Sequence, residues 1–355
     1  MNTLKANGSA QSLPSTYVDG FHNKDDVQKM KYRPLGETGM NVSCISFGGS
    51  VVGGGYFSTN DDESIKVVQS AIQSGINFID TAPWYGRSET VIGKALKNIP
   101  RNAYYISTKV CRYKPNVAEM FDFSAERTLR SVDESLQHLG LDYVDIIQVH
   151  DMEFAPSLDV VLNETLPALQ KIKQSGKARF IGITGYPLGN FKKIIEHSAV
   201  KIDTILSYCH LSLNDSSLLE HIPYFEENKV GVINASPISM GLLSNRGPPS
   251  WHPVTDDIKK ACKEAAVYCE SKGVNISKLA VYYSTSFSQV STTLCGVASL
   301  DILEKNLLVV HEPLSQLELQ TMQEVSDKYF KPLENKTWEG VEVNKYWKKL
   351  QSIQK

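Results

Sequence analysis

Four residues suited to proton-transfer chemistry stand at or just after the ends of short apolar runs. Asp80 ends the run INFID, Lys109 lies near the end of AYYISTKV, and His150 ends VDIIQVH. Tyr85 follows Asp80 by five residues, in FIDTAPWYG. A charge at the end of an apolar run needs a partner, because an unpaired buried charge is costly.

These side-chain types suit proton transfer at a carbonyl or an alcohol. A phenol has an ordinary pKa of about 10, and a neighbouring ammonium stabilises its anion. We expect Asp80 to hold Lys109, and Lys109 to lower the pKa of Tyr85, which then carries the proton. His150 is expected to hydrogen-bond the reacting oxygen. None of these groups stores hydride, so a nicotinamide cofactor must supply that part of the reaction.

Each residue taken singly also has a purely structural explanation. Asp80 could cap a turn, and Lys109 could be a surface charge. His150 could be a satisfied core histidine, and Tyr85 could be a packing aromatic. Their occurrence after three consecutive apolar runs favours a shared site.

The elements that position these residues follow a regular rhythm along the chain. Apolar runs that predict strands alternate with amphipathic stretches that predict helices, at 42–49, 76–82, 103–110, 144–150, 178–185, 204–209, 231–238 and 291–297. Eight such alternations predict a closed (β/α)8 TIM barrel, in which the ends of the strands meet at one mouth. A doubly wound open sheet is the alternative, but its G-x-G-x-x-G turn is missing. The segment GGSVVGGG, residues 48–55, instead indicates a loop whose backbone approaches something closely.

The barrel is predicted to span residues 31–331, with an additional segment at each end. Residues 1–30 are polar and form an expected arm, followed by a short hairpin that turns at 36–39. Residues 332–355 form a tail that contains Trp338, Tyr346 and Trp347. This tail is either a lid whose aromatics face a ligand, or a segment anchored to the outside of the barrel.

Composition excludes several other classes of protein. The 355 residues carry a net charge of -2, without the basic excess that a nucleic-acid or anionic-membrane binder would show. No apolar run reaches the roughly 18 residues of a transmembrane helix. The start of the chain lacks an apolar signal core, and the six cysteines are scattered, which is typical of reduced thiols in the cytosol. We therefore expect a cytoplasmic protein with no nucleic-acid or membrane partner.

The motifs around these residues resemble those of the aldo-keto reductases. FIDTAPWYGRSE, STKV and IIQVHD match that family's pattern for its catalytic Asp, Tyr, Lys and His, and GKARFIGITG and INASPISMGLL match two further segments. The resemblance covers residues 32–310. It implies the same barrel, an extended nicotinamide cofactor, and catalytic roles for Asp80, Tyr85, Lys109 and His150.

The resemblance also implies a set of cofactor contacts, with departures from the family pattern. Thr184-Gly185 replaces the Ser-Asn pair that binds the carboxamide, and Ala235 replaces the stacking Tyr. The expected cofactor-binding residues are Gly48, Gly49, Asp80, Thr184, Gly185, Ser207, Ser236, Pro237, Ile238, Gly241, Gly296, Val297, Ala298, Ser299 and Asn306.

The segment GVASLDILEKN bears on which cofactor is used. Gly296 and Ile302 stand where phosphate-preferring members carry the Lys and Arg that grip a 2′-phosphate. We therefore expect NAD, with NADP as the alternative if Lys305 replaces those cations.

Within the family, the motifs are most similar to the L-galactose dehydrogenase branch, whose members oxidise the anomeric carbon of a sugar to a lactone. FIDTAPWYG, FIGITGYPL, SYCHLSLND and ASPISMGLL carry this similarity. It implies a small-molecule sugar or carbonyl substrate contacted by Tyr85 and His150. We also expect Trp84 at the substrate, while Arg87 either reaches a sugar hydroxyl or faces solvent. The expected assembly is a monomer or weak homodimer. The alternatives are a carbonyl reductase of aldehydes or ketones, including steroids, and a cofactor-sensing partner similar to potassium-channel β subunits.

Overall fold

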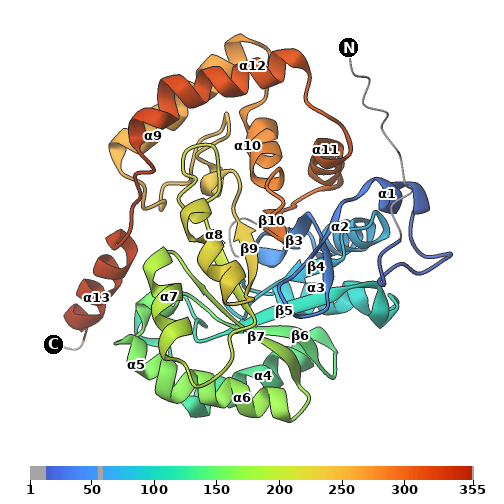
Figure 1. Cartoon of the computed structure of the whole chain (residues 1–355). Helices are drawn as coiled ribbons and strands as arrows, with labels where there is room; N and C mark the ends of the chain where they lie inside the picture. The colour runs from blue at the N-terminus through green and yellow to red at the C-terminus, as the bar shows by residue number, and fades with distance from the viewer. Residues whose placement is uncertain (1–12, 55–58, 354–355) are drawn as a thin grey trace.

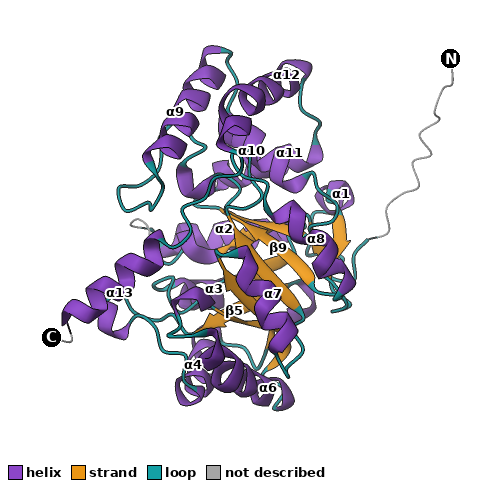
Figure 2. Ribbon diagram, turned by 60° about the vertical axis from the view of Figure 1, so that its left-hand side comes forward, coloured by secondary structure: helices purple, strands orange, loops and turns teal. Residues whose placement is uncertain are grey.

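Eight parallel strands close into a barrel surrounded by helices (Figures 1 and 2). The computed structural model describes residues 13–54 and 59–353. In order around the barrel, starting from the strand before closure, the strands are β10 (Thr292–Gly296), β3 (Ile45–Gly48), β4 (Phe78–Asp80), β5 (Tyr105–Val110), β6 (Val144–Val149), β7 (Ala178–Gly185), β8 (Thr204–Tyr208) and β9 (Gly231–Ala235). The predicted (β/α)8 barrel is confirmed.

The apolar run at 42–49 is not one strand but two. β2 (Asn41–Ser43) pairs antiparallel with β1 (Tyr32–Pro34), and β3 begins only at Ile45. The predicted hairpin turn contains Gly36 and Gly39, both with positive φ. At Gly36 a Cβ atom would lie 2.4 Å from the backbone nitrogen of Gly231, so the hairpin packs directly on the start of β9.

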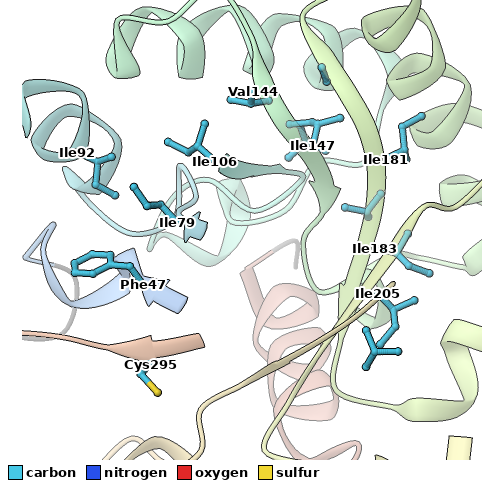
Figure 3. Close-up of a cluster of buried hydrophobic side chains, with 14 of the residues drawn as sticks. Phe47, Ile79, Ile92, Ile106, Val144, Ile147, Ile181, Ile183, Ile205 and Cys295 are labelled. Atoms are coloured by element: carbon cyan, nitrogen blue, oxygen red, sulfur yellow. The ribbon is translucent and has the colours of Figure 1, made fainter. Parts of the chain in front are cut away.

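Both faces of the barrel strands are buried. Inside the barrel, Phe78, Ile146, Leu206, Ile233 and Leu294 pack with Leu35, Met40 and Val42 from the hairpin segment. The outward-facing side chains form a larger layer beneath the helices, including Phe47, Ile79, Ile106, Ile147, Ile181, Ile183 and Ile205 (Figure 3). This double burial explains why the strands were visible as nearly continuous apolar runs.

Helices follow the strands along the chain, and capping residues mark several of their ends. Asn60 caps α2 by accepting from two backbone amides, and Ser124 caps α4, which ends at the left-handed Gly140. The larger helices around the barrel are α2 (Asp61–Gln73), α3 (Ser88–Leu96), α4 (Ala125–Leu139), α6 (Leu166–Gln174), α7 (Leu188–His197), α8 (Leu218–Glu227), α9 (Asp256–Ser271), α10 (Ile276–Thr285), α11 (Leu300–His311) and α12 (Gln316–Val325). Two short helices, α1 (Lys24–Lys29) and α5 (Leu158–Val160), complete the set together with α13 (Val341–Ile353).

The two segments outside the barrel both contact it. Of the expected arm at 1–30, residues 1–12 lie outside the described part; in the rest, Val27 and Met30 are buried and Thr16 accepts a hydrogen bond from Asn77. At the other end, α13 extends from the barrel in Figure 1 and contacts the short helical turns Val117–Glu119 and Met152–Phe154. Across the described ranges, every helix is too short or too polar to cross a bilayer.

Candidate active site

The carboxyl ends of the barrel strands bring the four proton-transfer candidates into one cavity. Asp80 is the last residue of β4, Lys109 is the penultimate residue of β5, and His150 directly follows β6. Tyr85 lies in the turn between β4 and α3. All four line a cavity of about 500 Å³, a size typical of small-molecule sites.

Asp80 and Lys109 form a buried ion pair. Their side chains are 4% and 1% exposed, and the ammonium of Lys109 donates to a carboxylate oxygen of Asp80 and to the carbonyl of Thr81, the latter at 3.0 Å. The other carboxylate oxygen of Asp80 accepts from Ser107 Oγ at 2.6 Å and from Gln148 Nε2 at 2.8 Å. These added donors satisfy the remaining lone pairs, which a buried pair needs if it is to be tolerated.

Tyr85 lies beside this pair. The ammonium nitrogen of Lys109 is 3.4 Å from the phenol oxygen and 4.8 Å from the ring centroid. The pKa of Tyr85 is nevertheless raised well above its ordinary value, because burial and the charges of Asp80 and Asp151 outweigh the opposing Arg112. This differs from the expected lowering: the carboxylate that holds Lys109 also acts on the phenol. Without a further positive charge nearby, Tyr85 is a neutral phenol.

His150 completes the quartet as a neutral imidazole. Its ring meets that of Tyr85 edge to face, with centroids 5.6 Å apart. Burial lowers the pKa of His150 to about 3; Asp151 opposes the shift, while Lys109 and Arg112 add to it. Nδ1 is buried and has no hydrogen-bond partner within the described ranges. A neutral imidazole can donate one hydrogen bond to a reacting oxygen.

Two residues that the sequence analysis missed, Arg112 and Asp151, also line the cavity. The guanidinium of Arg112 donates to Asp151 and lies 4.1 Å from the ring centroid of Trp84. Burial alone would raise the pKa of Asp151, but His150 and Arg112 lower it. Arg112 follows β5 and Asp151 follows β6. A search for polar residues that extended one or two positions beyond each predicted strand would have included both.

The C-terminal tail contributes a carboxylate to the cavity. Glu342 of α13 lines it, and so does Trp251 from the loop before α9. The tail aromatics lie elsewhere: Trp338 stacks on Tyr186, with centroids 4.9 Å apart, and Tyr346 packs against Phe121 and Phe154. Glu342 lies about two hundred residues after His150 in the sequence, so its position at the cavity was not predicted.

The expected cofactor residues divide into two groups. Gly48, Asp80, Thr184, Ser236 and Gly296 line the cavity. The others do not line it: Gly49, Gly185, Ser207, Pro237, Ile238, Gly241, Val297, Ala298, Ser299 and Asn306. Ser207 is fully buried between Leu206 and Tyr208, which both reach the cavity, and Ser299 caps α11.

Two departures from the family pattern have visible compensations. A Cβ atom on Gly185 would lie 2.7 Å from Oε2 of Glu153, so the carboxyl of Glu153 occupies the space of the missing side chain. Beside Ala235, and paired with it in the sheet, Tyr208 brings an aromatic ring to the cavity wall. Neither substitution therefore leaves a simple void.

The structure does not bring Arg87 into the cavity, although it is two residues from Tyr85. Its guanidinium makes a two-pronged contact with Asp61 on the surface, at 2.8 and 2.9 Å, and its side chain is 61% exposed. Gly86, with φ of 62°, turns the chain between Tyr85 and Arg87. Trp84, the other expected substrate contact, does line the cavity.

The Gly-rich loop after β3 approaches the turn that carries Tyr85. A Cβ atom on Gly53 would lie 2.0 Å from the carbonyl oxygen of Tyr85, and the carbonyl of Gly53 accepts from the amide of Arg87 at 2.9 Å. Ser88 Oγ donates to the carbonyl of Gly49 at 2.7 Å. The expected close approach is therefore to the chain itself; Gly55 lies outside the described residues.

Comparison with known proteins gives consistent matches. The model of the aldo/keto reductase family matches residues 44–327. L-galactose dehydrogenase from Arabidopsis thaliana is 46% identical over 90% of this chain and all of its own length. D-arabinose 1-dehydrogenase from Saccharomyces cerevisiae is 32% identical over 84% of this chain and 93% of its own. A holo aldo-keto reductase from Bacillus halodurans superimposes with a TM-score of 0.67 at 28% identity, covering 83% of this chain and 96% of its own.

Proposed function

This chain belongs to the aldo/keto reductase family, and from that premise we propose that it is an NAD-preferring dehydrogenase that oxidises the anomeric carbon of an aldose such as L-galactose to a lactone. Membership of this family supports an NAD(P)-dependent oxidoreductase activity. The cofactor preference, the substrate and the residue roles are the proposal. The observation that carries it is the contact of Tyr85 with the buried Lys109–Asp80 pair, in a cavity shared with His150.

In the proposed reaction, each of the four residues has a separate task. Tyr85, acting as its phenolate, takes the proton of the anomeric hydroxyl, and His150 donates a hydrogen bond to the same oxygen. A bound nicotinamide cofactor would supply the acceptor for the hydride of the anomeric carbon. Asp80 fixes Lys109, and the ammonium stabilises the phenolate form of Tyr85, which is the form that can take the proton. A positive charge beside Tyr85 would offset the acidic groups that raise its pKa, and oxidised nicotinamide carries one.

The residues at the strand ends fit a nicotinamide cofactor. Gly48 and Gly296 end neighbouring strands β3 and β10 and leave that part of the wall without side chains, so that a flat ring can lie against backbone. Thr184 and Ser236 add hydroxyls to the lining, and Tyr208 adds an aromatic face.

The preference for NAD is supported by the start of α11. Ile302 is an apolar side chain at the position where a cation would grip a 2′-phosphate, and Gly296 has no side chain. Lys305, the alternative cation, donates to Asp301 at 2.7 Å. Asp301 therefore offsets the charge of Lys305 and adds an acidic group that disfavours a phosphate.

The aldose is supported by the relatives and by the cavity. Two relatives bear the names of sugar dehydrogenases, L-galactose dehydrogenase and D-arabinose 1-dehydrogenase. Trp84 and Trp251 provide flat apolar surface, while Arg112, Asp151 and Glu342 provide polar contacts. A steroid would use the former and leave Glu342 without a hydrogen-bond donor. The tail supplies Glu342, and we propose that it acts as a fixed cover over the barrel mouth.

Steady-state kinetics test the proposal. The purified protein is assayed with L-galactose, D-arabinose, a steroid ketone and a small aldehyde, using both cofactors in both directions. We expect the highest kcat/KM for an aldose with NAD. A tenfold preference for NADP would overturn the cofactor assignment, and faster reduction of the ketone or aldehyde would favour the carbonyl reductase.

A cofactor-sensing partner remains the alternative of another class. It predicts tight cofactor binding with negligible turnover of every substrate in the same screen. The buried thiols, which are free in all six cysteines, support the cytosol as the proposed location.

A further inference from the structure

Glu342 is held at the cavity by the geometry of its own helix. Tyr346 lies four residues after Glu342 on α13, so that the two side chains share a helix face. The ring of Tyr346 meets Phe121 at 5.2 Å and Phe154 at 5.5 Å between centroids, edge to face in both cases. Because this anchor seats the helix, Glu342 one turn earlier faces the cavity.

A second anchor holds the segment that leads into α13. Trp338 is buried, stacks on Tyr186, and donates its backbone amide to the phenol of Tyr186 at 3.3 Å. His252 meets the other side of this cluster, with its centroid 5.1 Å from that of Trp338. The chain is thus anchored on both sides of Glu342, and these two contacts fix the position of the carboxylate.

The polar groups around Glu342 leave it without a partner of its own. The cationic side chain nearest in the cavity, Arg112, is already bonded to Asp151 and stacked on Trp84. No hydrogen bond or ion pair joins Glu342 to any residue in the described ranges. Burial and Asp151 both raise the pKa of Glu342, while Arg112 and Lys345 oppose them. A half-buried carboxyl group of this kind gains most from a ligand that donates hydrogen bonds.

The charges in the cavity narrow the class of ligand. Lys109 is bonded to Asp80, and Arg112 to Asp151, so Glu342 adds to the lining an acidic group that has no ion-pair partner among the described residues. An anionic sugar, such as a uronate or a sugar phosphate, would be repelled. An apolar substrate would cover Glu342 without satisfying it, which costs binding energy. A neutral polyhydroxy compound avoids the repulsion, and its hydroxyls can donate hydrogen bonds to Glu342.

We propose that Glu342 is a specificity-determining residue that accepts hydrogen bonds from hydroxyls of a neutral aldose. This inference rests on the proposed function and names the class of substrate that the same site selects. The carboxylate belongs to α13, outside the barrel, so selection and proton transfer are carried by different parts of the chain.

The test combines a change in the protein with a change in the sugar. Glu342→Gln and Glu342→Ala are compared with wild type on L-galactose and on its monodeoxy derivatives, with NAD. A lost hydrogen bond to a charged group corresponds to about a 10- to 100-fold change. We expect KM for L-galactose to rise by about tenfold or more in Glu342→Ala, with a smaller change in kcat. For the derivative that lacks the recognised hydroxyl, wild type and variant should have similar kcat/KM.

Glu339→Gln is the matched control, because Glu339 lies in the same tail and is exposed. Thermal unfolding confirms that each variant is folded. If both Glu342 variants match Glu339→Gln on every sugar, the inference is overturned while an active aldose dehydrogenase remains. If wild type oxidises no aldose, the proposed function itself has failed. If the variants lose every sugar equally, including all the deoxy derivatives, Glu342 is structural and the inference is again overturned.

Discussion

The ammonium nitrogen of Lys109 lies 3.4 Å from the phenol oxygen of Tyr85, and both groups lie at the carboxyl-terminal end of the barrel. The same ammonium is bound by Asp80, whose negative charge adds to the effect of burial in raising the pKa of Tyr85. The two charges therefore act on the phenol in opposite directions, and removing either one has a distinct consequence.

Tyr85→Phe should remove most of the turnover. The change deletes the phenol oxygen but keeps the ring that packs against His150. We expect kcat to fall by about 10²- to 10⁴-fold, the usual contribution of a positioned proton carrier, while NAD affinity changes little. Tyr224→Phe on α8 is the control, because Tyr224 is not among the residues that line the cavity. Activity close to wild type in Tyr85→Phe would exclude this role.

Lys109→Met should cost stability as well as activity. Removing one partner of a buried ion pair leaves the other uncompensated, typically at about 3–5 kcal/mol. The combined change Asp80→Asn with Lys109→Met removes both charges, and we expect it to recover much of that stability without recovering turnover. Urea unfolding measures the stability, and steady-state assays measure the activity. If the double variant were as unstable as the single one, the loss would arise from packing instead of the unpaired charge.

His150 should make the folded protein less stable in mild acid. Its pKa is lowered to about 3 in the folded protein, against about 6.5 for an unfolded chain, so the unfolded state binds more protons between these values. The contribution is therefore present above pH 6.5 and is lost as pH falls toward 3, by up to about 1.4 kcal/mol per pH unit. His150→Gln should flatten the dependence of unfolding free energy on pH over that window. An unchanged slope would mean that His150 is charged in the folded protein.

Gly53→Ala should disturb Tyr85 from a distance in sequence. The added methyl would meet the carbonyl of Tyr85 at 2.0 Å and the amide of Ser88 at 2.3 Å, so the turn must move. We expect a stability loss of about 1–3 kcal/mol and a lower kcat. Gly189→Ala is the control, since a Cβ atom there has open space. A fully active Gly53→Ala protein would show that the turn tolerates the shift.

Strand position carried most of what the sequence could predict. Asp80, Lys109 and His150 were placed correctly at one mouth because the apolar runs located the strands, and parallel strands in a barrel share an end. The boundaries were less accurate where chain direction reverses. Nothing in the run at 42–49 marks the change from the antiparallel hairpin to the barrel at Cys44.

Contacts between residues that are far apart in the sequence could not be predicted. Gln148 and Ser107 look like ordinary strand residues, yet both donate to Asp80, because alternate side chains of neighbouring strands meet inside the barrel. Arg87 shows the opposite limit: its proximity to Tyr85 in the sequence left open a place in the cavity, but the turn at Gly86 directs it to Asp61 on the surface. Glu342 required the packing of Tyr346, which only the folded structure provides.

The placement of Glu342 on α13 has a consequence for how such a protein can diverge. The proton-transfer side chains belong to β4, β5 and β6 and the turns after them, whereas this carboxylate belongs to a helix that follows the whole barrel. Substitutions in α13 can accumulate without altering the strands that hold the reactive groups. Homologues with this architecture can therefore keep the same catalytic residues while the proposed substrate preference changes.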